Sequence, residues 1–209
     1  MVTPLNILIT NHQLDGYGGT ETYVYTLSKF LKDNGHHVTI YSPFLGKVAE
    51  KINSHDIYVV DDLCLLKQSH FDIIHAQHNI TAIQARIMFP NVPMVLNIHG
   101  VIPALEQLPF LDLNVSQYVV VSEEIKHALN KKEIDNVSLI RNFVDTKRFY
   151  SKRPIHDQLQ HVLVLSNRMP KNMRHIVASS CKEYGISVSW VGEFKNHAWN
   201  IEDHVNGVD

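Results

Sequence analysis

The sequence predicts an α/β protein: a Rossmann-like, doubly wound parallel sheet followed by an incomplete second α/β domain. Short apolar runs rich in Val and Ile alternate with longer stretches of helical periodicity, as expected for parallel strands covered on both faces. The same alternation restarts after a polar stretch, and 209 residues of 44% hydrophobic content allow one ordinary domain and part of another. Repeated strand–helix–strand units imply right-handed crossovers and therefore a doubly wound sheet.

The predicted strands share near-continuous apolarity over four to seven residues. In chain order they are 5–10, 37–42, 57–60, 71–76, 93–99, 118–122, 137–140, 161–166 and 186–192.

The clearest predicted helix covers 20–34, where apolar residues recur on one face from Tyr23 to Leu31. Gly35 follows in a position that suits the end of a helix, and Lys32 stands in the last turn. Further helices are predicted at 80–88, 122–132 and 172–184. Ser122 is expected to cap the third of these four helices, with two glutamates in its first turn.

The domain organisation follows from a change of composition. Residues 1–150 are expected to form the first domain, and the polar, aperiodic stretch 151–160 is interpreted as a linker. Residues 161–209 begin a second Rossmann-like domain. A complete domain of this kind usually needs about 100 residues or more. We therefore expect an incomplete second domain, with its remaining part absent or its apolar surface covered in an oligomer.

Several classes of function are disfavoured by composition. The formal net charge of −2 supplies no basic field for nucleic acid. No apolar run approaches the roughly 20 residues of a membrane span, and the N-terminus does not resemble a signal peptide. Cys64 and Cys181 lie far apart and suit a reducing cytoplasm. His75 and His78 raise a metal hypothesis, but no acid or cysteine nearby completes a ligand set, so no metal site is predicted.

The glycine cluster after the first strand raises the question of a phosphate-binding turn. Gly16 and Gly18 could fill the first two positions of a dinucleotide fingerprint, but Glu21 stands where the third glycine belongs. No Gly-Lys-Ser/Thr follows, so the Walker pattern also fails. Gly18 and Gly19 nevertheless leave the backbone open at a helix N-terminus, which favours an anion or a sugar hydroxyl. The alternative is a loop tip that binds nothing.

Seven motifs in the same order resemble the family-4 glycosyltransferases of the GT-B fold. They are G-G-x-E at 18–21, NGHHVTIYS at 34–42, FDIIHAQH at 71–78, PMVLNIHG at 93–100, YVVVSEEIKHAL at 118–129, LIRNFVDTKRF at 139–149 and VLVLSNRMPKN at 162–172. Phe143 replaces the usual glycine of the sixth motif, and Asn167 replaces the glycine of the seventh.

The resemblance implies transfer of a sugar from a nucleotide diphosphate sugar to an acceptor hydroxyl, with retention and without a bound metal or other cofactor. It implies that His99, at the end of an apolar strand, contacts sugar or acceptor as the candidate catalytic residue. The residues implied to bind donor or acceptor are Gly18, Gly19, Glu21, Ser122, Arg168 and Lys171. Of these, Arg168 and Lys171 are expected to meet the donor phosphates from the second domain, and Gly18 and Gly19 are expected to approach the diphosphate and the acceptor from the first.

On this view the acceptor is a saccharide or a lipid-linked acceptor. The protein is expected to be cytoplasmic, with peripheral association at the inner membrane face as an open alternative. The family's E-x7-E element is missing after residue 160, so we expect a truncated form with little activity by itself. Two other readings stay open: a nucleotide-sugar epimerase of the same architecture, and a non-catalytic α/β module that binds a sugar or a protein.

Overall fold

The structure is a computed structural model, and it describes residues 3–152, 154, 157–166, 169–192 and 198–208. The chain divides into two compact units, Met1–Phe143 and Val144–Asp209, which are described separately.

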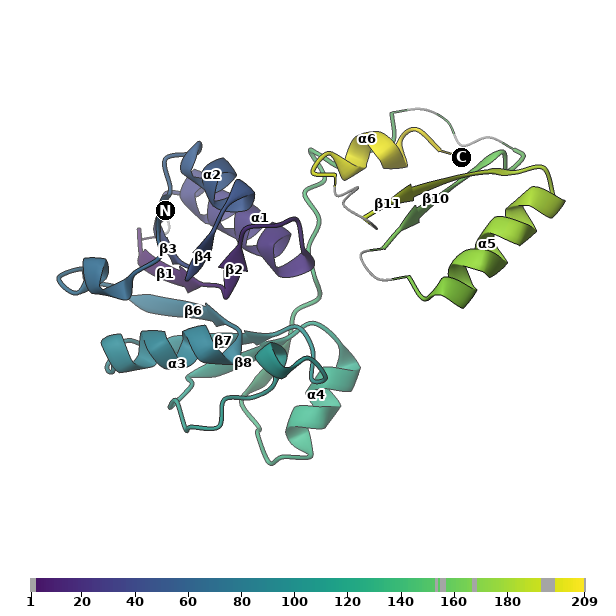
Figure 1. The fold of residues 1–209 in the computed structure, drawn as a ribbon. Coiled ribbons are helices and arrows are strands. Elements are labelled where there is room, and N and C mark those ends of the chain that lie inside the picture. Colours follow the sequence, from purple (N-terminus) through teal and green to yellow (C-terminus); the bar gives the residue numbers. More distant parts are fainter. Residues whose placement is uncertain (1–2, 153, 155–156, 167–168, 193–197, 209) are drawn as a thin grey trace. The chain divides into compact units, whose positions relative to one another are not determined.

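Unit 1 is built on a seven-stranded sheet in which every neighbouring pair is parallel (Figure 1). Its strands, in spatial order, are β5 (Tyr58–Val60), β3 (His37–Tyr41), β1 (Asn6–Thr10), β6 (Ile73–Gln77), β7 (Met94–Ile98), β8 (Gln117–Val120) and β9 (Val137–Leu139). From β1 the chain first adds β3 and then β5 on one side of the sheet. It then returns to the other side of β1, where it adds β6, β7, β8 and β9 in turn. The sheet therefore has a topological switch point between β1 and β6, and the predicted doubly wound fold is confirmed.

The central strand β1 is buried on both faces. Leu8 is fully buried and packs in the main core cluster with Ala82 and Ala85 of α3 (Asn79–Met88). Ile7 and Ile9 point to the opposite face, because side chains alternate along a strand, and they are also buried. A strand covered on both faces carries apolar side chains on both, which explains why the sequence signal for these strands was continuous rather than alternating.

The helix after β1 lies within one residue of the predicted range 20–34 at each end. α1 spans Gly19–Asp33, and Gly35 has a φ of +88°, in the left-handed region that favours glycine. The amides of Gly35 and His36 bond back to the carbonyls of Lys32 and Leu31, which is the Schellman arrangement. α4 (Glu123–Asn130) is capped as predicted by Ser122, whose hydroxyl accepts from the Ile125 amide at 3.4 Å.

Several short elements were not predicted from the sequence. They are α2 (Lys47–Asn53), the two-residue strands β2 (Gln13–Leu14) and β4 (Phe44–Leu45), the 3-10 turns η1 (Leu63–Leu66) and η2 (Ala104–Glu106), and α6 (Ile201–Val205). β2 and β4 pair in parallel and attach the glycine loop to the segment before α2.

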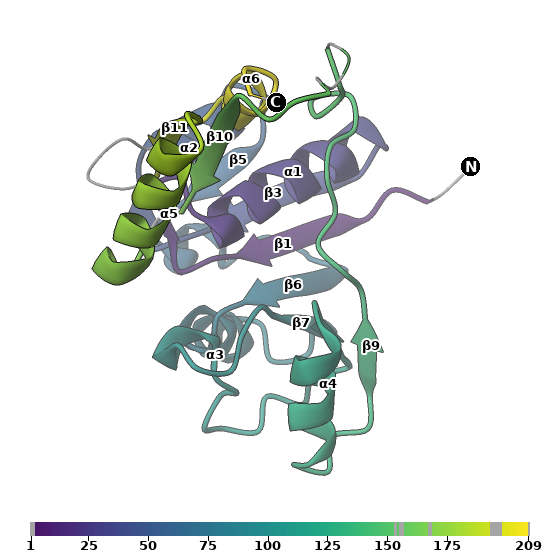
Figure 2. The same ribbon diagram turned by 90° about the vertical axis from the view of Figure 1, so that its right-hand side faces the viewer.

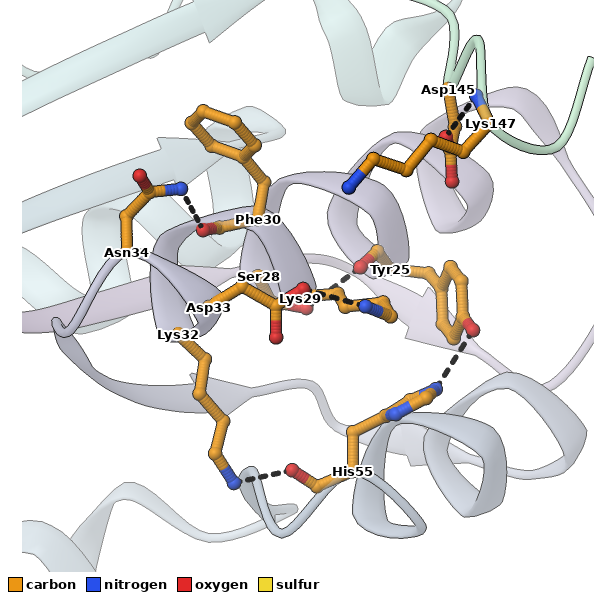
Figure 3. A network of polar contacts seen from close by, with 10 residues as sticks. All are labelled: Tyr25, Ser28, Lys29, Phe30, Lys32, Asp33, Asn34, His55, Asp145 and Lys147. Carbon is orange, nitrogen blue, oxygen red and sulfur yellow. Dashed lines mark hydrogen bonds and ion pairs between the residues drawn. The ribbon is translucent and has the colours of Figure 1, made fainter.

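Two polar networks hold the helices of unit 1 in place. The Tyr25 hydroxyl lies 2.9 Å from His55 Nε2. Lys32 donates to the backbone carbonyl of His55, as Figure 3 shows. These contacts attach α1 to the turn after α2. On α3, the Arg86 guanidinium donates to the carbonyls of Leu113, Pro90 and Val92, each at 2.8 Å. Arg86 thereby fixes the chain that leaves α3 against the segment that approaches β8.

Unit 2 contains a two-stranded parallel sheet, β10 (His161–Leu165) and β11 (Ser187–Val191), with α5 (Lys171–Glu183) lying along it (Figure 2). α5 also ends in a Schellman arrangement, at Gly185. The segment before β10 bonds to α6 through two ion pairs, Arg148 with Glu202 and Lys152 with Asp203, both at 2.8 Å. The boundaries 1–150, 151–160 and 161–209 stay a prediction.

Candidate functional site

The polar groups of unit 1 concentrate where β1, β6 and β7 end. Open α/β sheets bind ligands at the carboxyl ends of their strands, beside the switch point. Asn11 and His12 follow β1, Gln77 ends β6 and His78 follows it, and His99 follows β7. Because these strands are neighbours in the sheet, the residues form one polar edge, called here the switch-point edge.

The glycine turn at this edge is shaped around a buried carboxylate. The Glu21 side chain folds back from the first turn of α1 and is only 3% exposed. Its two oxygens accept from Gln13 Nε2 at 2.9 Å and from the Thr20 hydroxyl at 3.0 Å. A Cβ on Gly18 would lie 2.9 Å from Glu21 Cδ and closer still to one oxygen, whereas a Cβ on Gly19 would meet nothing within 4 Å. Gly18 therefore makes room for Glu21, and Gly19 leaves open space at the helix N-terminus.

His99 is held by two amide side chains through a single ring nitrogen. Its Nε2 lies 2.6 Å from Gln77 Oε1 and 2.8 Å from Asn97 Nδ2. An amide oxygen only accepts, so the first bond needs a proton on Nε2, while an amide nitrogen only donates, so the second needs Nε2 bare. The two bonds belong to the two neutral tautomers of the ring. When Nε2 carries the proton, Nδ1 is an acceptor, and when Nε2 is bare, Nδ1 carries the proton and donates. In either tautomer Nδ1 can bond a hydroxyl group, because a hydroxyl both donates and accepts.

An aromatic layer covers His99 from the side of α1. The Tyr23 ring meets the His99 ring edge-on at 4.9 Å between centroids, stacks over His75 at 6.2 Å and contacts Phe143 at 4.7 Å. Burial raises the pKa of Tyr23 to about 12, so its hydroxyl stays protonated. Phe143, which departs from the family pattern in sequence, thus packs beside the candidate site. Through Tyr23, the first turns of α1 and His99 belong to one packed group.

Three buried histidines at and beside this edge have lowered pKa values. Burial lowers the pKa of His75, His78 and His99 to about 4 each, with neighbouring histidines adding to the effect at His78 and His99. These three side chains are therefore neutral imidazoles near pH 7.

His78 has an unusual backbone. Its φ of +59° and ψ of 140° are uncommon for any residue with a Cβ and cost on the order of 1–3 kcal/mol. The conformation places His78 immediately before α3 and lets its Nδ1 accept from the His12 amide at 3.2 Å. Strain of this kind persists where surrounding contacts fix it, which is common at functional sites.

Six buried polar atoms of the described part of unit 1 have no hydrogen-bond partner, and all belong to this region. They are Asn11 Oδ1, His12 Nδ1, His75 Nδ1, Gln77 Nε2, Asn79 Oδ1 and Asn97 Oδ1. Buried polar groups are nearly always paired, so each exception needs an explanation such as a ligand or an ordered water. Three of these atoms belong to the switch-point edge, and the other three belong to neighbouring residues of β6, α3 and β7, which marks this edge as the candidate site.

The other residues singled out in the sequence lie in different surroundings. Ser122 stands at the end of β8, where its hydroxyl caps α4. Lys171 is the exposed first residue of α5 in unit 2. Arg168 lies outside the described residues. His78, Gln77 and Asn97 were missed as site residues, although polar side chains that close an apolar strand, as in HAQHN and LNIHG, were a usable signal.

Among the described residues, no three His, Cys, Asp or Glu side chains gather as metal ligands would. None of the described helices combines the length and apolarity needed to cross a bilayer.

Comparison with known proteins adds a family and a fold. A family model described as Glycosyltransferase Family 4 matches residues 17–148. A search of curated proteins found no match.

Solved structures similar to this chain share its fold at low sequence identity. HepE from Anabaena in complex with UDP-glucose has a TM-score of 0.69 at 15% identity, over 97% of this chain and 65% of that one. A glycosyltransferase from Rickettsia africae has a TM-score of 0.72 at 18% identity, over 99% of this chain and 65% of that one. Sucrose-phosphate synthase from Thermosynechococcus elongatus has a TM-score of 0.58 at 13% identity, over 98% of this chain and 74% of that one. The chain spans 65% of the length of the first two.

Proposed function

Because the chain belongs to glycosyltransferase family 4, we propose that it serves the transfer of a sugar from a nucleotide diphosphate sugar to an acceptor hydroxyl, with retention at the anomeric carbon. The observation that supports this most is the reach of the family match. The family match covers Glu21, Gln77, His99 and Ser122. It therefore includes the part of the switch-point edge that follows Tyr17 in the sequence.

His99 is the proposed catalytic contact. Sugar transfer develops positive charge on the sugar ring, and a neutral imidazole can bond a sugar hydroxyl there without adding like charge. Gln77 and Asn97 hold one ring nitrogen and leave Nδ1 for the substrate, since no described residue bonds to it. Gly19 gives a saccharide close access to the start of α1, and Gly18, Glu21 and Ser122 complete the proposed donor- and acceptor-binding residues of unit 1.

The donor phosphates are assigned to unit 2. A leaving diphosphate needs charged donors, and Arg168 and Lys171 are the residues that the family resemblance places there. UDP-glucose bound to HepE supports a UDP-sugar as the first donor to test. No metal or other cofactor is part of the proposal.

The activity of the whole enzyme is a proposal, because the chain spans only 65% of the similar structures' length. A cytoplasmic location, peripheral membrane association and oligomerisation likewise stay predictions.

Donor binding tests the proposal directly. Calorimetric titration of the full-length protein with UDP- and GDP-sugars is expected to give a signal that depends on the diphosphate. Arg168→Ala should weaken donor binding by more than about 1 kcal/mol, the low end for charged hydrogen bonds. Lys182→Ala, an equal charge change at an exposed position of α5, is the control. No binding of any donor would refute the proposal.

Transfer assays test the role of His99. His99→Ala is expected to lower kcat at least tenfold, because a contact made near the reacting carbon is lost. His37→Ala is the matched control, since His37 is exposed at the opposite end of the sheet, where β3 begins. Equal activity of the two variants would remove His99 from the mechanism.

A further inference from the structure

The glycine turn is attached to the segment that precedes α2. β2 pairs in parallel with β4, so that Gln13 lies beside Phe44 and Leu14 beside Leu45. The His12 ring meets the Phe44 ring edge-on at 5.2 Å between centroids, and the Leu14 side chain is fully buried. A pair of two-residue strands is too short to be stable by itself, so the contacts around it decide where the turn lies.

Gly46 follows β4 directly and lies against the backbone of Asp15. A Cβ at position 46 would lie 2.7 Å from Asp15 Cα and 3.1 Å from both its Cβ and its carbonyl oxygen. Ordinary van der Waals contact begins at about 3.4 Å, and a backbone atom cannot rotate away as the end of a side chain can. The φ of Gly46 is −178°, an extended value that any residue adopts. Glycine is therefore needed here for the close approach of two backbones.

The place of Asp15 determines the place of the ligand-binding end of the turn. Two residues separate Asp15 from Gly18 in the sequence. On the other side of Asp15, Gln13 donates through Nε2 to the buried Glu21 carboxylate at 2.9 Å, which joins the start of the turn to the first turn of α1. A shift of the Asp15 backbone therefore moves the turn at which Gly18 and Gly19 are proposed to approach the donor diphosphate.

We propose that Gly46 is a positioning residue for donor binding. Because it carries no side chain, the segment between β4 and α2 closes on Asp15 and fixes the glycine turn in its place. This rests on the proposed function, in which Gly18 and Gly19 meet the donor. Gly46 touches no substrate itself and acts through Asp15.

The size of the effect follows from the geometry. In a Gly46→Ala protein, Asp15 Cα must move by about 0.7 Å, the difference between 3.4 Å and 2.7 Å, to reach ordinary contact with the new Cβ. An amide-to-phosphate hydrogen bond of about 2.9 Å that lengthens by the same distance reaches about 3.6 Å and is lost. Loss of one charged hydrogen bond lowers affinity roughly tenfold or more. We therefore expect Gly46→Ala to raise the Kd of the donor roughly tenfold.

Calorimetric titration of the full-length protein tests the inference, with UDP-glucose, UDP-N-acetylglucosamine and GDP-mannose as probes. Gly16→Ala is the matched control, because it is the same substitution in the same turn and its Cβ would meet nothing within 4 Å. It should leave Kd within twofold. Titration also separates positioning from folding, since a smaller folded fraction lowers the binding stoichiometry and leaves Kd unchanged. Gly46→Ala should do the reverse.

NMR of the backbone amides follows the turn itself without any ligand. Gly46→Ala should shift the amide signal of Gly19 more than Gly16→Ala does, although position 16 is three residues from Gly19 in the sequence and position 46 is 27 residues away. An unmoved Gly19 signal in the Gly46→Ala protein would show that Gly46 does not set the place of the turn, and would overturn the inference.

The titration has two further outcomes that would overturn the inference while the proposed function stands. One is a Kd of the Gly46→Ala protein within twofold of the unchanged protein. The other is a lower stoichiometry with an unchanged Kd, because Gly46 would then matter only for folding. If the unchanged protein binds no donor, the proposed function is refuted and the inference falls with it, so the two failures are distinguishable.

Discussion

Replacing Gly18 by alanine is the sharpest test of how the glycine turn is built. The new Cβ would overlap the Glu21 carboxylate, which must then leave its bonds with Gln13 and Thr20. Hydrogen bonds to charged groups contribute about 1.5–3 kcal/mol each, and the displaced carboxylate can recover part of this in water. We therefore expect Gly18→Ala to lower the free energy of unfolding of unit 1 by about 2–4 kcal/mol.

Gly19→Ala is the matched control, because its Cβ would meet nothing and Ala is the better helix former. It should leave stability unchanged or raise it slightly.

Urea unfolding measures the difference. Both tryptophans, Trp190 and Trp199, lie in unit 2, so unit 1 should be followed by far-ultraviolet circular dichroism or tyrosine fluorescence. With a urea dependence of about 2 kcal/mol/M, Gly18→Ala should lower the midpoint by about 1–2 M.

A second background separates the overlap from a simple loss of helix capping. In a Glu21→Ala protein the overlap is gone, so Gly18→Ala should there cost only the small difference between Gly and Ala at an N-cap, about 1 kcal/mol or less. An equal cost of Gly18→Ala with and without the Glu21 side chain would refute the reasoning.

Three other predictions concern stability. Burial holds the pKa of His75, His78 and His99 at about 4, below the ordinary 6.5, so the folded state binds fewer protons than the unfolded state between these values. The stability of unit 1 should thus fall as pH drops from about 6.5 towards 4, and a urea midpoint that is equal at pH 7 and pH 5 would contradict this. Arg86→Lys should cost about 2–3 kcal/mol in urea unfolding, because one ammonium cannot reach the carbonyls that the guanidinium spans, and a loss below about 0.5 kcal/mol would count against that role. Gly35→Ala should cost about 1 kcal/mol or more, since φ is +88° there, and an unchanged midpoint would disprove the strain.

The regular elements of the sheet could be predicted because their signals are local and continuous. β1 is buried on both faces, so every residue of ILI is apolar, and α1 carries both an apolar stripe and a glycine stop. α2 was missed because its seven residues offer only Val48, Ala49 and Ile52 as a buried face, less than two turns of pattern. β2 and β4 are two residues each, and they exist only because residues about 30 positions apart meet.

The sequence predicted the edge of the sheet on which the candidate site lies, but only some of the residues that form it. His99 ends an apolar strand, so its place at the carboxyl edge of the sheet followed from the sequence. Gln77 and Asn97 were not found, because their significance lies in which atoms are left unpaired once β6 and β7 are side by side. The backbone of His78 is equally invisible in sequence, since positive φ is expected at glycine rather than histidine.

The glutamate that breaks the dinucleotide fingerprint explains why this turn differs from a pyrophosphate-binding one. In that fingerprint the positive end of the helix meets a phosphate. Here the Glu21 carboxylate already lies in the first turn of α1, bonded to Gln13 and Thr20, and Gly18 exists to admit it. The carboxylate is only 3% exposed, so its charge is held inside the turn by its two hydrogen bonds. The start of the helix stays open at Gly19, where a Cβ would meet nothing within 4 Å. The turn therefore differs from a dinucleotide-binding one in what fills it, and it still leaves the backbone at the helix N-terminus open to a ligand.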